Sequence, residues 1–187
     1  MKRQFKCFIF DLDGTLVNTV EDLAAAFNHM RKELGFPQVS IAMVQQMIGN
    51  GVRDLICQSF ANVNIKPTED ELKNAIKLMI DYYKAHLVVK TAAYPGVAET
   101  LEFMHKKGIK TAVVTNKRAE AALGLLEQLD LAEYLYLLFL GLHHNEICLC
   151  IDSGRNIGHD TGIIRCLLLL RFYYIQYGYR CCKSYRA

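Results

Sequence analysis

The chain has 187 residues, of which 52% are hydrophobic and 22% charged, and a formal net charge of +3. This balance is typical of a soluble globular protein with one domain, or a core domain with a modest insertion, and it excludes a strongly basic surface for nucleic acid or anionic membranes. The first apolar run, Cys7 to Phe10, is too short for a signal peptide or a membrane span, so a cytoplasmic protein without membrane association is expected.

Residues 6–10 open the predicted fold as a short buried strand. They are apolar on both faces, which is typical of a parallel sheet covered by helices. A long helical stretch follows, with apolar residues at helical spacing and recognisable caps. Helices are expected over residues 20–34, from Ser40 through Met47, after Gly51, and from Thr68 to about Val88.

The chain then returns to a strand pattern. After a turn at residues 92–97, a helix is expected up to Gly108, then a buried strand over 109–116 and a helix from about 117 to 129. This order predicts an α/β fold with a Rossmann-like parallel sheet and an all-helical insertion after the first strand. We expect a core made of residues 1–18 and 91–187 and a helical cap made of residues 19–90.

The sequence changes character at about residue 135. Helix caps become scarce, and Cys, Tyr, Leu and Arg dominate the segment 135–187. This segment is either a divergent piece that still closes the sheet or the product of a reading-frame change near residues 135–145. We favour the frame change as a hypothesis, which reading the coding DNA in the other two frames tests.

Asp11 and Asp13 directly follow the first predicted strand, where open α/β sheets bind their ligands. Two carboxylates at this point repel each other unless a cation or a shared proton offsets the repulsion, and Mg²⁺ suits such a pair. One aspartate can attack phosphorus while the other acts as acid and base. Gly14 can let the backbone turn closely around a phosphate and Thr15 can donate hydrogen bonds; for a lone Asp-x-Asp, a simple Asx-turn is the alternative.

The full string DLDGTL after a strand resembles the haloacid dehalogenase-like superfamily, in its phosphoglycolate phosphatase-like branch, over roughly residues 4–134. The resemblance implies the fold of that superfamily, with Asp11 as the nucleophile and Asp13 as the general acid and base. It also implies that the Asp11 side chain and the Asp13 carbonyl hold Mg²⁺. The second aspartate favours phosphate transfer over dehalogenation.

The second motif is VVTNK, in which Thr115 ends the second strand and Asn116 follows it. A hydroxyl and backbone N–H groups at a helix N-terminus make an anion site, and the resemblance implies that Thr115 binds phosphate. A plain helix cap by Thr115 is compatible with the same geometry.

The string IGNGVRDLI in the predicted cap resembles the loop that reaches over the substrate in phosphoglycolate phosphatase-like members. Gly49 and Gly51 can let backbone approach a small carboxylate, and Arg53 can pair with it. The alternative is a glycine-bracketed helix start with a solvated Arg53. Closure of a cap excludes water from the site.

Two parts that the resemblance implies do not follow clearly in the sequence. A lysine is expected after the second motif, but none occurs between Lys117 and Lys183. Arg155 or Arg165 could substitute for it, but nothing in their sequence context supports this role. Asp152, in CIDSGRNIGHD, is the nearest candidate for a further Mg²⁺ ligand, although the preceding glycine is absent and the spacing differs.

Together these features predict Mg²⁺-dependent hydrolysis of a small phosphomonoester through an aspartyl-phosphate, with 2-phosphoglycolate as the best single candidate. The alternatives are a phosphatase or phosphomutase for another sugar phosphate, and a catalytically impaired or dead phosphate- or Mg²⁺-binding protein. The expected partner is a small phosphorylated metabolite and not nucleic acid. The oligomeric state does not follow from the sequence.

Overall fold

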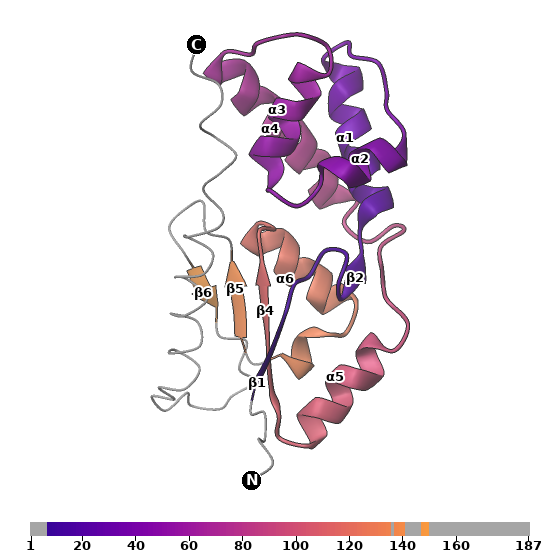
Figure 1. Ribbon diagram of the computed structural model, residues 1–187, viewed down its shortest axis with the longest axis vertical. Coiled ribbons are helices and arrows are strands. Elements are labelled where there is room, and N and C mark those ends of the chain that lie inside the picture. Colours follow the sequence, from indigo (N-terminus) through magenta and orange to yellow (C-terminus); the bar gives the residue numbers. More distant parts are fainter. Residues whose placement is uncertain (1–6, 136, 141–146, 150–187) are drawn as a thin grey trace. The chain divides into compact units, whose positions relative to one another are not determined.

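The computed structural model describes residues 7–135, 137–140 and 147–149 (Figure 1). Among these residues, no helix combines the length and the hydropathy that a bilayer span needs. The elements run in the order β1 (Cys7–Phe10), β2 (Val17–Asn18), α1 (Val20–Glu33), α2 (Ile41–Met47), α3 (Val52–Ala61), α4 (Glu69–Ala85), β3 (Ala92–Ala93), α5 (Val97–Lys106), β4 (Lys110–Thr115), α6 (Ala119–Gln128), a 3-10 turn (Ala132–Tyr134), β5 (Leu137–Leu140) and β6 (Ile147–Leu149).

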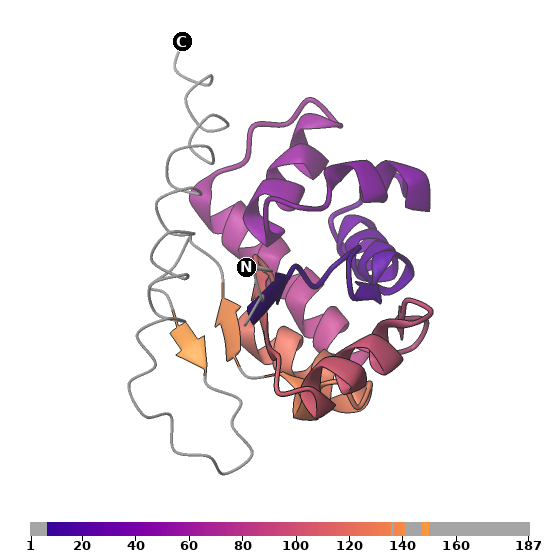
Figure 2. The same cartoon turned by 60° about the horizontal axis from the view of Figure 1, so that its bottom comes forward.

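The main sheet has the strand order β1-β4-β5-β6. Strand β4 pairs in parallel with β1 and with β5, and the register places Phe10 opposite Val113. Parallel neighbours need a crossover connection, which α5 and α6 supply, and Figure 2 shows both helices on one face of the sheet. The predicted α/β fold with a Rossmann-like parallel sheet is confirmed. Strand β6 differs from that prediction because it pairs antiparallel with β5.

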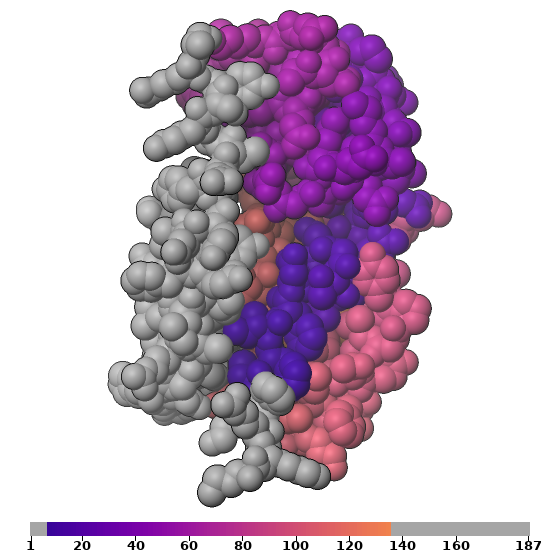
Figure 3. Space-filling model, viewed as in Figure 1, coloured from indigo at the N-terminus to yellow at the C-terminus, as the bar shows by residue number. Residues whose placement is uncertain are grey.

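The core forms where these two helices meet the sheet. Leu101 of α5, Val113 of β4 and Leu125 of α6 are all at most 1% exposed. Strand β1 is half-buried along its length rather than fully buried, and the indigo segment that begins at Cys7 is visible on the surface in Figure 3. The end of β1 therefore lies close enough to solvent for a small ligand to reach it.

Four helices, α1 to α4, lie between the two short strands β2 and β3. These strands pair antiparallel, with Val17 opposite Ala93, and close the base of the insertion. Each has two residues, which is too short for the period-2 pattern that predicts strands. The helical content predicted for residues 19–90 is confirmed, while the division into two domains stays a prediction.

The helix starts follow the predicted caps. The Ser40 hydroxyl accepts a hydrogen bond from the Met43 N–H at 3.2 Å. Thr68 and Glu71 form a reciprocal capping box at the start of α4. These contacts satisfy amide groups that the first turn of a helix leaves without a backbone partner.

Inside the insertion, the fully buried Arg31 fastens α1 to α3. Its guanidinium donates to the Ser59 hydroxyl at 2.7 Å and to the Pro37 carbonyl at 2.6 Å. Such a planar, multiply bonded group fixes the relative placement of two helices.

The predictions for Asp152, for Arg155 and Arg165, and for a reading-frame change concern residues outside the described part of the chain. They stay predictions.

Candidate active site

The loop after β1 turns around a single backbone carbonyl. The Leu12 carbonyl accepts hydrogen bonds from the amides of Leu16 and Val17, at 3.0 and 3.1 Å. Gly14 adopts φ +78°, a left-handed conformation that favours glycine, and its N–H donates to the Val17 carbonyl at 2.9 Å. Gly14 therefore shapes the loop through its conformation, while its amide is already used within the loop.

Asp11 is the first residue past β1, and its carboxylate accepts the Leu12 N–H at 2.7 Å. Burial raises the pKa of Asp11, and the nearby charge of Asp13 raises it further. The Leu12 amide, the Thr115 hydroxyl and the Lys117 ammonium act in the opposite direction without cancelling that rise. Asp11 thus interacts with Asp13, Thr115 and Lys117, which come from two neighbouring strand ends.

Lys117 is the residue at this site that sequence reasoning missed. Its Nζ lies 2.9 and 3.0 Å from the two Asp13 carboxylate oxygens, and its side chain is only 5% exposed. The Thr19 hydroxyl also donates to Asp13, at 2.7 Å. The signal was present in VVTNK, but a lysine was expected further along the chain. Because the pair is largely withdrawn from water, it is screened far less than an exposed ion pair.

Thr115 ends β4 beside β1 and is 4% exposed. Its hydroxyl accepts the Lys117 N–H at 3.2 Å and also interacts with Asp11. Helix α6 begins at Ala119 with Arg118 as its N-cap and without a side-chain cap bond, so the alternative of Thr115 as a plain helix cap is wrong, and its phosphate-binding role stays a prediction. Thr15 is exposed in the β1 loop, and its N–H donates to the Leu12 carbonyl at 3.3 Å.

The IGNGVRDLI loop reaches this site through a backbone contact. The Asn116 side-chain amide donates to the Gly49 carbonyl at 3.0 Å, which links two residues expected to bind substrate. Gly49 and Gly51 have φ values of +135° and +89°, so both adopt conformations that favour glycine. Gly51 immediately precedes α3.

Arg53 instead contacts the next helix. Its guanidinium donates to both carboxylate oxygens of Glu69, at 3.0 and 2.8 Å, and both side chains are more than half exposed. An exposed pair of this kind contributes little stability, so Arg53 can exchange partners at small cost. Its role toward a substrate carboxylate stays a prediction.

The residues of the β1 loop suit a hard cation. The Asp11 carboxylate and the Asp13 carbonyl are oxygen donors, and Mg²⁺ binds to one or two carboxylates together with water and phosphate oxygens. Within residues 7–135, no cluster of three or more His, Cys, Asp or Glu side chains suits a metal. The protein donors therefore fit a Mg²⁺ ion that keeps water or phosphate ligands, and the expected contribution of Asp152 lies outside the described residues.

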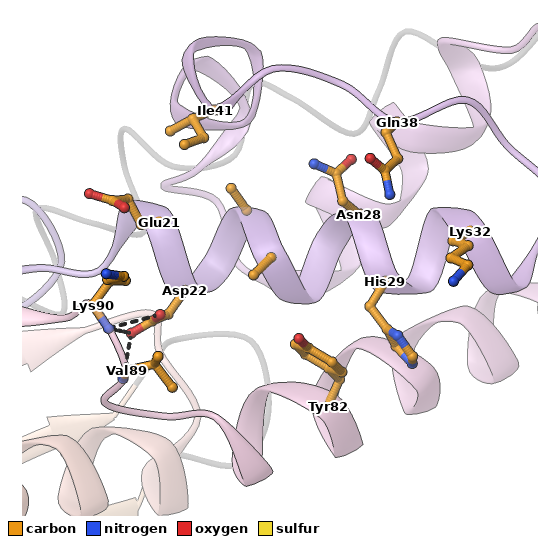
Figure 4. A pocket seen from close by; sticks show the side chains of 12 residues that line it. Glu21, Asp22, Asn28, His29, Lys32, Gln38, Ile41, Tyr82, Val89 and Lys90 are labelled. Carbon is orange, nitrogen blue, oxygen red and sulfur yellow. Dashed lines mark hydrogen bonds between the residues drawn. The ribbon is translucent and has the colours of Figure 1, made fainter.

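A separate pocket of about 530 Å³ lies along α1, and Figure 4 shows the side chains that line it. Its lining does not include Asp11, Asp13 or Thr115. The Asp22 carboxylate at its edge is bonded to the backbone of Val89 and Lys90, so it is not free to bind a ligand.

A family model and several known proteins match this chain in sequence. The family model for haloacid dehalogenase-like hydrolases matches residues 8–145. A phosphoglycolate phosphatase of Nitrosospira multiformis is 38% identical over 137 residues, which cover 73% of this chain and 60% of the relative. The phosphoglycolate phosphatase of Agrobacterium fabrum is 36% identical over 126 residues, covering 67% of this chain and 54% of that protein.

A crystal structure of a predicted phosphoglycolate phosphatase from Haemophilus somnus 129pt resembles this chain with a TM-score of 0.72 and 30% identity. The match covers 92% of this chain and 74% of that one. By contrast, the chain spans only about half to three fifths of the length of the two curated relatives.

Proposed function

The chain belongs to the haloacid dehalogenase-like hydrolase family, and on this premise we propose that it is a Mg²⁺-dependent phosphatase for a small phosphomonoester, with 2-phosphoglycolate as the first substrate to test. The observation that carries the proposal is the buried contact of Lys117 with Asp13 beside Asp11. A phosphate dianion needs positive charge next to two carboxylates, and Lys117 supplies it.

In the proposed first step, an Asp11 carboxylate oxygen attacks phosphorus in line with the leaving oxygen. The new Asp11–phosphorus bond forms as the ester P–O bond breaks, and Asp13 gives a proton to the leaving alkoxide. In the second step, water attacks the aspartyl-phosphate and Asp13 takes a proton from it. The Asp11 carboxylate and inorganic phosphate are then released.

Lys117 has to change partners for this cycle to work. Asp13 accepts hydrogen bonds from Lys117 and Thr19, so both donors occupy the carboxylate that has to carry the proton. We propose that an incoming phosphate takes over the Lys117 ammonium, which leaves Asp13 able to carry the proton. The Thr115 hydroxyl interacts with the Asp11 carboxylate, and we propose that it binds a phosphate oxygen there.

The Asp11 carboxylate and the Asp13 carbonyl are the groups that would hold Mg²⁺. When bound, Mg²⁺ supplies positive charge that offsets the charge on the phosphate oxygens. The other tasks belong to the side chains of the protein. Asp11 and Lys117 position the phosphate, and Asp13 transfers the proton.

The test is release of inorganic phosphate from 2-phosphoglycolate and from a few sugar phosphates, with Mg²⁺ and with a chelator. We expect Mg²⁺-dependent turnover that Asp11→Asn reduces by about a thousandfold or more, since the amide is a poor nucleophile. Asp81→Asn is the matched control, because Asp81 is exposed on α4 and pairs only with Lys77 among the described residues. Turnover that survives Asp11→Asn contradicts the mechanism.

A second candidate is a phosphate-binding protein without turnover. It is favoured by the contacts of Asp13 with Lys117 and Thr19, which occupy the carboxylate of the expected acid. Phosphate or Mg²⁺ binding without hydrolysis of any phosphomonoester supports this candidate. The cytoplasmic location rests on the sequence alone and stays a prediction.

A further inference from the structure

The pocket along α1 is bordered by apolar side chains that are exposed to solvent. Ile41 of α2 is 46% exposed, and Val89, which follows α4, is 62% exposed. Figure 4 shows these two residues on opposite sides of α1. Ala25 of α1 also lines the pocket and is exposed, and its small side chain lets another backbone approach the helix. Exposed apolar surface rimmed by polar residues is typical of a protein interface.

Two polar side chains within this pocket already have partners in the fold. The Asn28 side chain donates to the Val39 carbonyl and accepts the Val39 N–H, both at 2.9 Å. The Asp22 carboxylate accepts the amides of Val89 and Lys90. Because these groups are satisfied, apolar surface can cover them without leaving a buried donor or acceptor unpaired. The pocket therefore suits a protein surface better than a small polar ligand.

Opposite charges mark the two ends of the exposed stripe of α1. Glu21, Ala25, Asn28 and Lys32 follow one another at intervals of four, three and four residues, so they lie on one face of the helix. At a rise of 1.5 Å per residue, Glu21 and Lys32 are about 16 Å apart along the helix axis. Both side chains are exposed, and neither forms an ion pair among the described residues, Lys90 included.

We propose that this face binds a second copy of the chain, with the two α1 helices antiparallel across a twofold axis. The axis crosses the helices midway between the two charges, so Glu21 of each copy lies opposite Lys32 of the other. A symmetric dimer requires a self-complementary patch of this kind. Ala25 lies near the crossing point, where it permits close approach, and Ile41 and Val89 supply apolar area on either side. This inference goes beyond the proposed function and does not depend on it.

The size of the face indicates a weak dimer. The pocket is lined by 12 residues, about half of the 20–30 residues that each partner contributes to a standard interface. Exposed ion pairs add little affinity, but they select the orientation because like charges placed opposite each other repel. We expect a Kd of about 100 µM, with a monomer at about 5 µM and mainly dimer at about 500 µM.

Sedimentation velocity of the full chain across this concentration range measures the equilibrium. Glu21→Lys and Lys32→Glu should each raise Kd by about tenfold or more, because symmetry places the like charges opposite each other twice. Lys77→Glu is the matched control, since Lys77 is exposed on α4, does not line the pocket and pairs with Asp81 of its own helix. It should change Kd by less than about twofold. A wild-type chain that stays monomeric throughout overturns the proposal, as does a dimer that Glu21→Lys leaves intact.

An equal mixture of the two variants tests the antiparallel arrangement itself. In the mixed dimer, the lysine introduced by Glu21→Lys lies opposite the glutamate introduced by Lys32→Glu. The native Lys32 of the first variant lies opposite the native Glu21 of the second, so both pairs attract. The mixture should therefore dimerise with a Kd within about threefold of the wild type, although neither variant does so alone. Such a rescue excludes misfolding as the cause of the single-variant losses, and a mixture that stays monomeric contradicts the proposal.

Discussion

Asp22→Asn is expected to lower the free energy of unfolding by about 3 kcal/mol. Asp22 lies in the first turn of α1, is 4% exposed, and binds the segment that leads into β3. Its carboxylate accepts the backbone amides of Val89, Lys90 and Thr91 at 2.8 to 3.1 Å, and the Thr91 hydroxyl at 2.8 Å. It therefore ties together the two ends of the helical insertion.

The magnitude follows from these donors. Asparagine keeps one acceptor oxygen but turns an N–H₂ group toward amides that also donate. At least one buried amide then loses its acceptor, which costs about 1–3 kcal/mol, and the remaining bonds lose the added strength of a charged acceptor. A loss of this size is a large part of the 5–15 kcal/mol that typically stabilises a folded domain.

The loss should also depend on pH. Burial by itself raises the pKa of Asp22, but the hydrogen bonds from Lys90, Thr91 and Val89 outweigh it and hold the pKa below the usual 3.8. The folded state therefore binds fewer protons than the unfolded state near this pH. The stabilisation is complete at pH 7 and is lost as pH falls below about 4 through the folded pKa.

Urea denaturation followed by far-UV circular dichroism at pH 7 and pH 3 measures both effects. Glu21→Gln is the control, because Glu21 is exposed in the same helical turn and carries the same charge. The difference between wild type and Asp22→Asn should be large at pH 7 and smaller at pH 3. If Asp22→Asn costs no more than Glu21→Gln at pH 7, the reasoning is refuted.

Three other substitutions test separate contacts. Thr68→Ala should lower the free energy of unfolding by about 1 kcal/mol through loss of the α4 cap, measured by urea denaturation, and an unchanged value contradicts the cap. Arg31→Lys should lower the free energy of unfolding, measured in the same way, by about 2–3 kcal/mol, because a lysine cannot form the hydrogen bonds to Pro37 and to Ser59 at the same time. A loss below about 0.5 kcal/mol argues against this role of Arg31. Lys117→Met should weaken binding of inorganic phosphate at least about tenfold by calorimetry, and unchanged affinity removes Lys117 from the proposed site.

Much of the fold could be predicted from the sequence because the signals are local. Apolar spacing and caps gave α1 to α6 within a few residues, and an apolar run gave β4. The α/β class with a parallel sheet followed from the alternation of strands and helices along the chain. The short strands β2 and β3 carry no pattern of their own, since two residues cannot express a period, and they form only because the two ends of the insertion meet.

The candidate site was predictable in part for the same reason. The sequence by itself determined that Asp11 and Asp13 follow one strand and that Thr115 ends another, because a strand end and its next residues are adjacent in the chain. Whether those strands are neighbours, and which charge lies between them, depends on packing between distant residues. Only the tertiary structure brought Lys117 to Asp13.

The same distinction explains the roles of Asp22, Arg53 and Tyr83. In sequence, Asp22 is an ordinary acid of a first helical turn, Arg53 a candidate for binding substrate, and Tyr83 one of many helical aromatic residues. The fold gave Asp22 three backbone amides, gave Arg53 the carboxylate of Glu69, and buried the Tyr83 hydroxyl without a hydrogen-bond partner among the described residues. Local sequence sets what a side chain can bind, but the partner it meets is decided by which distant segments pack together, because hydrogen bonds and ion pairs act over only a few ångströms.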